Sequence, residues 1–211
     1  MQAIGKVYHL FQFDRSLKVR WLAKELNLSL EAVKLDAQQG EHLKPPFSHL
    51  NPFGLVPTYE NLAGEIQFEA GAICLSLARE YQPELLDETS NEFNQWLFFL
   101  TSSLDQLSGN LISLRVFGDS EDIKSRTKSR LPHKLDALEN KLKGQTYWHK
   151  NQFSLLDIFA WQNLAYLRAV GELSEATYPE LNRYILALAE RPALAAFSPE
   201  KLLFPTEEAK N

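Results

Sequence analysis

The first 81 residues alternate short apolar runs with one amphipathic stretch, a pattern typical of a small mixed α/β domain. The apolar positions between 17 and 26 recur at helical spacing behind Ser16, which we interpret as an N-cap. Turn residues at 61–64 separate two strand-like runs and predict an antiparallel hairpin. The predicted elements are a strand at 7–11, a helix at 17–26, a strand at 29–35, a proline-containing loop at 40–53, a hairpin of 58–60 and 65–68, and a helix at 69–81.

Beyond residue 90 the apolar spacing becomes helical. Pro83 stops the preceding helix and polar residues follow it, so we place a linker at 83–90 between domains of residues 1–82 and 91–211. Helices are predicted at 92–115, 131–142, 155–169 and 179–190, and Pro132 should kink or restart the second of them. Ser154 and Asp157 have the spacing of a capping box, and we assign this pair to stability.

Composition narrows the possible functions. The formal net charge of −5, with no stripe of Lys and Arg, argues against a nucleic-acid binder. The first ten residues hold no long apolar run, so we expect neither a signal peptide nor a membrane anchor. The lone Cys74 excludes an intrachain disulfide and suits the reducing cytoplasm. The five histidines show no paired metal spacing, so no metal is expected.

Two neighbouring motifs point to one binding site. Pro57 stands just before a short strand, where a cis peptide bond would turn the backbone groups of Val56 toward an extended peptide. Glu69 begins a helix, so its carboxylate can accept from an ammonium while the first backbone N–H groups donate to a carboxylate. A site that pairs with peptide backbone and also binds an amino-acid head group is typical of glutathione recognition.

In these motifs the chain resembles the cytosolic glutathione S-transferase superfamily, and within it a bacterial-type or theta-like member. The resemblance rests on the order and spacing of four stretches at 8–21, 40–59, 68–78 and 153–160. It implies a thioredoxin-like α/β N-terminal domain (βαβ-ββα) followed by an all-α C-terminal helical domain. It also implies a cytoplasmic homodimer that uses glutathione as co-substrate against a small electrophilic substrate.

The resemblance assigns a set of binding residues and shows two departures from the family. Leu55 stands where Gln or Lys often reaches glutathione, and Ala70 stands where a hydroxyl residue is usual. A missing donor of this kind costs on the order of 1 kcal/mol. His42 resembles a residue that binds the glycyl carboxylate, with Lys44 as a nearby cation. The implied glutathione-binding residues are His42, Lys44, Leu55, Val56, Pro57, Glu69 and Ala70.

The residue that activates the thiol is left open among three candidates. Many classes have a serine three positions before the first helix, and this chain has Phe13 there, which carries no donor. Tyr8 is the candidate by analogy with tyrosine classes, while Ser16 and Arg15 lie beside the helix N-terminus. Each has a structural alternative: an N-cap for Ser16, a solvated or domain-bridging cation for Arg15, and a core or dimer contact for Tyr8.

The resemblance also places a hydrophobic-substrate pocket between the domains, lined by Phe13, Leu111 and Arg115 near the tail at Leu203 and Phe204. Phe13, Leu55 and Ala70, each standing where the family usually has a polar side chain, together support a competing interpretation: a noncatalytic relative kept as a binding or dimerisation module. Retention of Glu69, Val56, Pro57 and His42 favours the enzyme, because a scaffold needs none of them.

Overall fold

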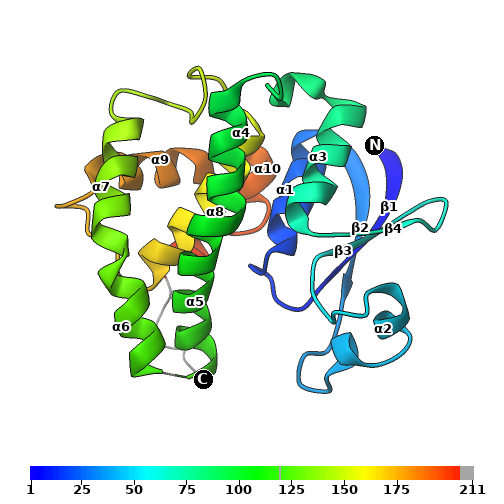
Figure 1. Cartoon of the computed structure of the whole chain (residues 1–211). Helices are drawn as coiled ribbons and strands as arrows, with labels where there is room; N and C mark the ends of the chain where they lie inside the picture. Colours follow the sequence, from blue (N-terminus) through cyan, green and yellow to red (C-terminus); the bar gives the residue numbers. More distant parts are fainter. Residues whose placement is uncertain (119, 205–211) are drawn as a thin grey trace. The chain divides into compact units, whose positions relative to one another are not determined.

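The computed structural model describes residues 1–118 and 120–204, and the chain divides into two compact units, Met1–Leu85 and a second that begins at Leu86 (Figure 1). The first unit combines a four-stranded mixed sheet with helices, and the second is helical. The fold class predicted from the sequence is therefore confirmed.

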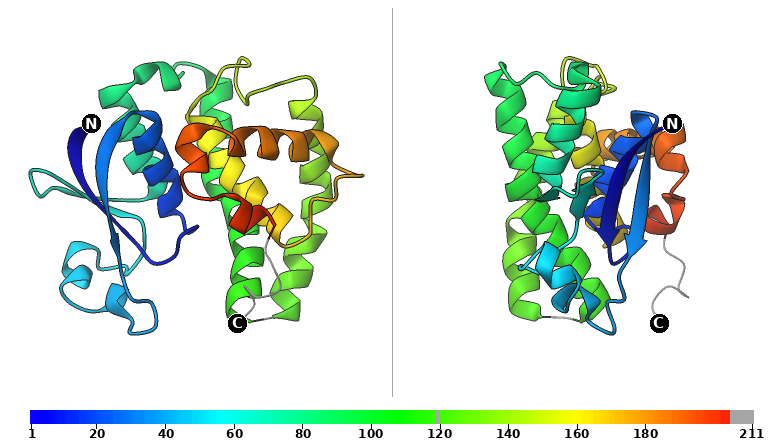
Figure 2. Two further views of the ribbon diagram at one scale, coloured as in Figure 1. Left: turned by 180° about the vertical axis from the view of Figure 1, so that it is seen from behind. Right: turned by 90° about the vertical axis from the view of Figure 1, so that its right-hand side faces the viewer.

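The sheet of the first unit has the strand order β2-β1-β3-β4. Its strands are β1 (Gln2–His9), β2 (Leu28–Lys34), β3 (Thr58–Asn61) and β4 (Ile66–Phe68). β1 and β2 are parallel and lie side by side in the right-hand view of Figure 2, while β3 runs antiparallel to β1 and to β4. The predicted hairpin is the β3–β4 pair.

Helices α1 and α3 pack against each other and on the sheet, and bury Leu17, Trp21, Ile73 and Leu77. The predicted loop at 40–53 contains only short helical turns. The helical segments of this unit are α1 (Ser16–Glu25), the 3-10 turn η1 (Glu41–Leu43), α2 (Phe47–Leu50), α3 (Ala70–Tyr81) and the 3-10 turn η2 (Pro83–Leu85).

Two local predictions in this unit were wrong. β1 begins at Gln2 and ends at His9, because pairing with β2 already starts at Gln2 and holds the first residues in the sheet, whereas Phe11 lies beyond the strand. Ser16 is the first residue of α1 and not its N-cap, and its side chain caps no helical N–H group. Asp14 accepts the Ser16 N–H instead, at 2.9 Å.

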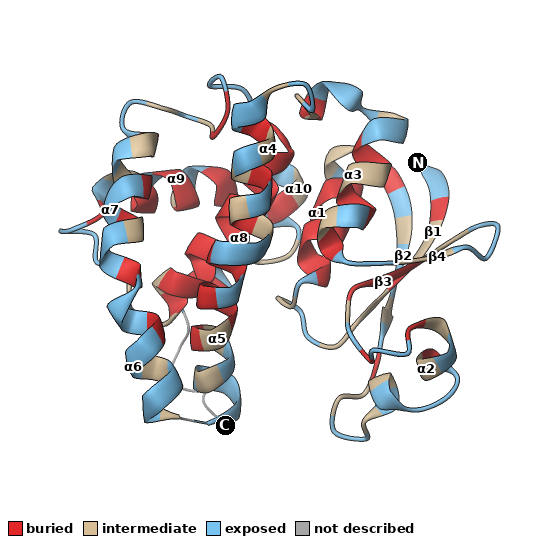
Figure 3. Cartoon of the chain, viewed as in Figure 1, coloured by how far each residue is buried: buried red, intermediate tan, exposed pale blue. Residues whose placement is uncertain are grey.

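The second unit is built around α8, whose residues are almost all buried (Figure 3). The predicted break at Pro132 is confirmed, since α6 ends at Ser129 and α7 restarts with this proline in its first turn. The segments are α4 (Asn91–Phe98), the π-helical turn η3 (Phe99–Ser103), α5 (Leu104–Phe117), α6 (Glu121–Ser129), α7 (Leu131–Leu142), α8 (Leu155–Ala169), α9 (Pro179–Ala189), α10 (Pro192–Ala195) and α11 (Glu200–Leu203).

The predicted helix at 92–115 extends from Asn91 to Phe117 but is interrupted by the π-helical turn η3. A π turn shifts the hydrogen-bond register of the helix. The Leu100 carbonyl in this turn accepts from the side-chain amide of Asn163 at 2.7 Å, and Ser108 donates to the other end of that amide at 3.2 Å. A residue of α8 therefore stabilises the interruption.

The predicted capping box at Ser154 and Asp157 is present at the start of α8. The buried Asp157 carboxylate accepts from the Ser154 N–H, the Trp148 N–H and the Tyr184 hydroxyl, each at 2.8 Å. Burial raises the pKa of this carboxyl, and these hydrogen bonds act in the opposite direction. Through these hydrogen bonds Asp157 joins the start of α8 to the preceding loop and to α9.

Within residues 1–118 and 120–204, no helix is long and apolar enough to cross a membrane.

Candidate functional site

Several predicted binding residues meet at one edge of the sheet. Thr58, the first residue of β3, pairs with Tyr8 on one side and with Phe68, the last residue of β4, on the other. Pro57 precedes Thr58 and Glu69 follows Phe68, so the two predicted motifs emerge next to each other at this edge. This juxtaposition is the centre of the candidate site.

The loop before Pro57 is held by Asn51, which is buried. The Asn51 amide donates to the Leu55 carbonyl and to the Thr58 hydroxyl, both at 3.0 Å, and its oxygen accepts the Phe53 N–H at 3.0 Å. The Leu55 side chain is left 59% exposed beside the site. Asn51 was not among the predicted site residues, although an Asn before Pro-Phe-Gly is typical of a side-chain-stabilised turn.

Val56, which follows Leu55 in this loop, is partly buried. The Val56–Pro57 peptide bond is cis. Across the described part of the chain, no hydrogen bond engages the Val56 N–H or C=O. Both groups are therefore available to the backbone of an extended peptide, in the manner of strand addition.

The N-terminus of α3 provides an anion-binding feature beside Val56. Ala70 is its first residue, and no side chain caps the helix. The first N–H groups of a helix have no acceptor within it and carry partial positive charge. Glu69, just before the helix, has a positive φ of 71° and an exposed side chain. Strained residues of this kind concentrate at ligand sites.

The 3-10 turn η1 brings His42 to the same loop. A Cβ added at Gly54, whose φ is 63°, would lie 2.6 Å from Leu43 Cδ2 and 3.0 Å from the His42 carbonyl oxygen, so the two segments are in close contact. His42 Nδ1 is buried and has no hydrogen-bond partner among the described residues. A ligand group could supply that partner. Lys44 is exposed, and its ammonium donates to the Gln39 carbonyl at 2.6 Å.

Asp14 organises the connection from β1 to α1, where the catalytic candidates lie. Its carboxylate accepts from the backbone N–H groups of Leu10, Phe11 and Ser16, at 2.7, 2.9 and 2.9 Å. The Ser16 hydroxyl also donates to Asp14, and it accepts from Arg20 Nε at 3.1 Å. Ser16 is fully buried. Its hydroxyl proton is thus already donated to the Asp14 carboxylate.

The Tyr8 hydroxyl is engaged in a similar way. It donates to the Glu60 carboxylate at 3.0 Å, and Lys6 pairs with the same carboxylate at 3.2 Å. Burial and Glu60 raise the pKa of Tyr8. The Tyr8 ring packs edge-on against Phe47 of α2, with centroids 5.4 Å apart. This geometry favours the structural interpretation of Tyr8 over a thiolate donor.

Arg15 immediately precedes α1 and is exposed. Phe13, half-buried, lies in the same connection. The other two predicted pocket residues belong to the second unit: Leu111 is buried in α5, and the Arg115 guanidinium donates to the Ala169 carbonyl at the end of α8. The pocket predicted from these three residues stays a prediction.

Metal-binding side chains are not gathered anywhere in the described residues, where no group of three or more His, Cys, Asp or Glu could hold an ion. Cys74 is fully buried, and burial raises the pKa of its thiol to about 12.

Known proteins match both units. The family model of the glutathione S-transferase N-terminal domain matches residues 3–79, and that of the C-terminal domain matches residues 121–187. A glutathione S-transferase of Arabidopsis thaliana is 29% identical over 182 residues, which cover 80% of this chain and 82% of that protein. The protein URE2 of Kluyveromyces marxianus is 32% identical over 120 residues, or 51% of this chain and 29% of that protein. A glutathione transferase homologue from Sulfitobacter, solved with bound glutathione, superposes with a TM-score of 0.78 at 20% identity, over 96% of this chain and 100% of that one.

Proposed function

Because this chain belongs to the glutathione S-transferase superfamily, we propose that it binds reduced glutathione and activates the thiol for attack on an electrophilic, hydrophobic substrate. The observation that carries the proposal is the edge where the Val56–Pro57 loop, the uncapped start of α3 and the His42 turn meet. Glutathione offers a peptide backbone, an amino-acid head group and a terminal carboxylate. Each has a matching group at this edge.

The proposed binding mode follows from those matches. The Val56 backbone pairs with the cysteinyl residue of glutathione. Glu69 accepts from the γ-glutamyl ammonium, and the first N–H groups of α3, from Ala70 onward, donate to the γ-glutamyl carboxylate. His42 and Lys44 bind the glycyl carboxylate. Leu55 and Pro57 line the site without donating a side-chain hydrogen bond.

For thiol activation we propose Arg15. The hydroxyls of Tyr8 and Ser16 both donate to carboxylates, whereas Arg15 is an exposed cation at the start of α1. A guanidinium and a helix N-terminus both favour the thiolate over the thiol and so lower the pKa of the bound thiol. The thiolate then forms the new carbon–sulfur bond with the electrophile, while a leaving group departs with its bonding electrons or, at an activated double bond, the π electrons move onto the electron-withdrawing group of the substrate.

The test is an ultraviolet difference spectrum of the protein with saturating glutathione, recorded as a function of pH. A thiolate signal near neutral pH supports the transferase. Arg15→Lys should keep most of that signal and Arg15→Gln should lose it, because the guanidinium acts through its charge. An unchanged signal in Arg15→Gln would reject Arg15 as the activating residue.

A noncatalytic glutathione-binding or dimerisation module is the second candidate. It is favoured by Phe13 at the usual serine position and by the engaged hydroxyls of Tyr8 and Ser16. Similarity to URE2 over 120 residues is consistent with this candidate, since that relative is not named as a transferase. Calorimetric binding of glutathione without thiolate formation would identify such a module.

We also propose a cytoplasmic homodimer, on the grounds of family membership and the single Cys74. Sedimentation equilibrium of the purified chain tests the oligomeric state, and a monomer at micromolar concentration would reject it.

A further inference from the structure

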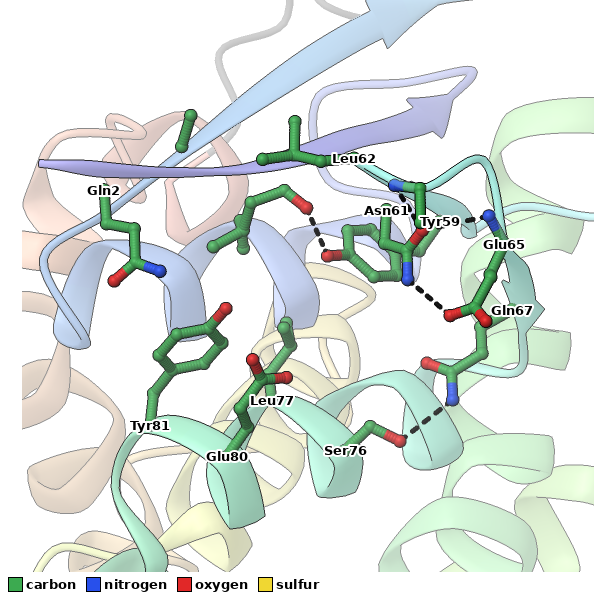
Figure 4. Close-up of a pocket in the computed structure, with 13 residues that line it drawn as sticks. Gln2, Tyr59, Asn61, Leu62, Glu65, Gln67, Ser76, Leu77, Glu80 and Tyr81 are labelled. Carbon is green, nitrogen blue, oxygen red and sulfur yellow. Dashed lines mark hydrogen bonds between the residues drawn. The ribbon is translucent and has the colours of Figure 1, made fainter.

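A cavity of about 420 Å³ lies in the first unit, between the start of β1, the β3–β4 hairpin and the C-terminal half of α3 (Figure 4). It is at the opposite end of β3 from the proposed glutathione site: Thr58 begins the strand at that site, whereas Asn61 ends it and lines the cavity. Its volume falls within the range of about 300–1,000 Å³ that holds small molecules. None of the residues assigned to glutathione lines it.

The lining combines an apolar floor with an acidic wall. Ile4, Tyr59 and Leu77 form the floor and are each more than nine-tenths buried. Glu80 on α3 and Glu65 on the hairpin contribute carboxylates, and no Lys or Arg is among the described residues that line the cavity. The formal charge of the lining at neutral pH is therefore negative.

The remaining polar groups are neutral. The Glu80 carboxylate and the Tyr81 hydroxyl rise from α3 toward the sheet, and the Gln2 side chain extends from β1 toward them (Figure 4). Burial raises the pKa of Tyr59 to about 12, with smaller contributions from the nearby Tyr81 and Glu80. Burial and Glu80 also raise the pKa of Tyr81. Both hydroxyls therefore stay protonated, and the carboxylates dominate the electrostatic potential.

Each carboxylate already has one neutral donor, the Tyr81 hydroxyl for Glu80 and the Asn61 amide for Glu65, and what distinguishes Glu80 is its position beside an aromatic ring. One oxygen of Glu65 already accepts from the Asn61 amide at 2.7 Å. The Glu80 carboxylate lies between the Tyr81 ring and the apolar floor (Figure 4). A carboxylate beside an aromatic ring and an apolar surface suits a cation that carries a flat apolar body.

We propose that this cavity binds a small organic cation of the amidinium or arylammonium type, with its charge paired to Glu80 and its body on the floor formed by Ile4, Tyr59 and Leu77. Gln2 and Tyr81 accept the remaining hydrogen bonds of the cation. An anion such as glutathione is disfavoured here, so the cavity and the proposed glutathione site are chemically distinct. The two sites can be occupied together.

The test uses benzamidinium as probe and benzamide as its neutral isostere, titrated by calorimetry into the full chain at low salt. Saturable binding of benzamidinium and not of benzamide is expected, and the affinity should fall as salt screens the carboxylate. Glu80→Gln should weaken binding roughly fivefold, the upper range for an exposed ion pair. Glu84→Gln is the matched control, because it makes the same change in net charge at an exposed residue outside the cavity.

Equal binding of benzamide, no saturation up to millimolar benzamidinium, or equal weakening by Glu80→Gln and Glu84→Gln would each overturn the proposal. Competition by reduced glutathione would also overturn it, because it would place the probe at the other end of the hairpin. The benzamidinium titration is independent of whether the protein binds glutathione.

Discussion

Replacement of Glu69 tests the placement of the glutathione site most directly. Among the described residues, no hydrogen bond or ion pair engages the Glu69 side chain. The residue therefore contributes little to folding through its carboxylate. Glu69→Gln removes the negative charge while keeping the shape of the side chain and the backbone conformation with a φ of 71°.

The expected loss of affinity follows from the bond that the carboxylate would make. A hydrogen bond between charged groups contributes about 1.5–3 kcal/mol, which corresponds to roughly 10- to 100-fold in affinity. Since Glu69 is exposed, solvent screening favours the lower end, about tenfold. Glu69→Ala also removes the acceptor oxygens and should abolish measurable binding. The free energy of unfolding should change by no more than about 0.5 kcal/mol in either variant.

Calorimetric titration with reduced glutathione measures the affinity, and thermal unfolding followed by circular dichroism measures stability. Glu31→Gln, at an exposed position on β2, is a control with the same change in net charge. If Glu69→Ala still binds glutathione within twofold of the unmodified protein, the site does not lie at this edge. A large loss of stability in either variant would contradict the absence of side-chain partners.

Three further changes have expected outcomes. Asp157→Ala removes the acceptor of four buried donors and should lower the free energy of unfolding by about 3 kcal/mol or more, with a smaller loss in Asp157→Asn, as measured by urea denaturation. Hydrogen bonds from Lys150 and His149 lower the pKa of Asp87 to about 2. The stabilisation from its ionised carboxylate is therefore present above pH 3.8, the pKa of an unperturbed Asp, and is lost as the pH falls from there toward 2. Asp87→Asn should therefore flatten the dependence of the urea midpoint on pH in that window. Phe13→Ser introduces a hydroxyl donor and should lower the pKa of the thiol of bound glutathione by about one unit, measured by the thiolate absorbance.

The fold was predictable because hydrophobic spacing is a local signal. The order of strands and helices, the hairpin, the restart at Pro132 and the capping box at Ser154 all follow from neighbouring residues. The π-helical turn η3 could not be predicted, since it depends on Asn163, 63 residues away from Leu100. The first half of β1 was missed for a similar reason: residues 2–5 show no alternation of apolar and polar side chains, and pairing with the distant β2 holds them in the sheet.

The candidate site was predictable only in part. A proline before a strand and an acidic residue at a helix start are local features, and they led to Val56, Pro57 and Glu69. The partners of the candidate hydroxyls were not predictable in the same way. Tyr8 donates to Glu60, which is 52 residues away, and this pairing depends on the register between β1 and β3. Asp14, which lies only two residues before Ser16, could have been recognised as the acceptor for that helix start.

The conformation of Glu69 bears on the choice between an enzyme and a scaffold. A positive φ in a residue other than glycine costs about 1–3 kcal/mol, and a module that only holds the fold together gains nothing from it. The helix α3 without a side-chain cap and the buried Nδ1 of His42, which has no hydrogen-bond partner among the described residues, are also unfavourable for a module that only holds the fold together. These costs are offset if a ligand binds at this edge, so they support retained glutathione binding. They say nothing of thiol activation, which depends on the separate connection between β1 and α1. There both hydroxyl candidates donate to carboxylates, and catalysis consequently depends on whether the charge of Arg15 reaches the bound thiol.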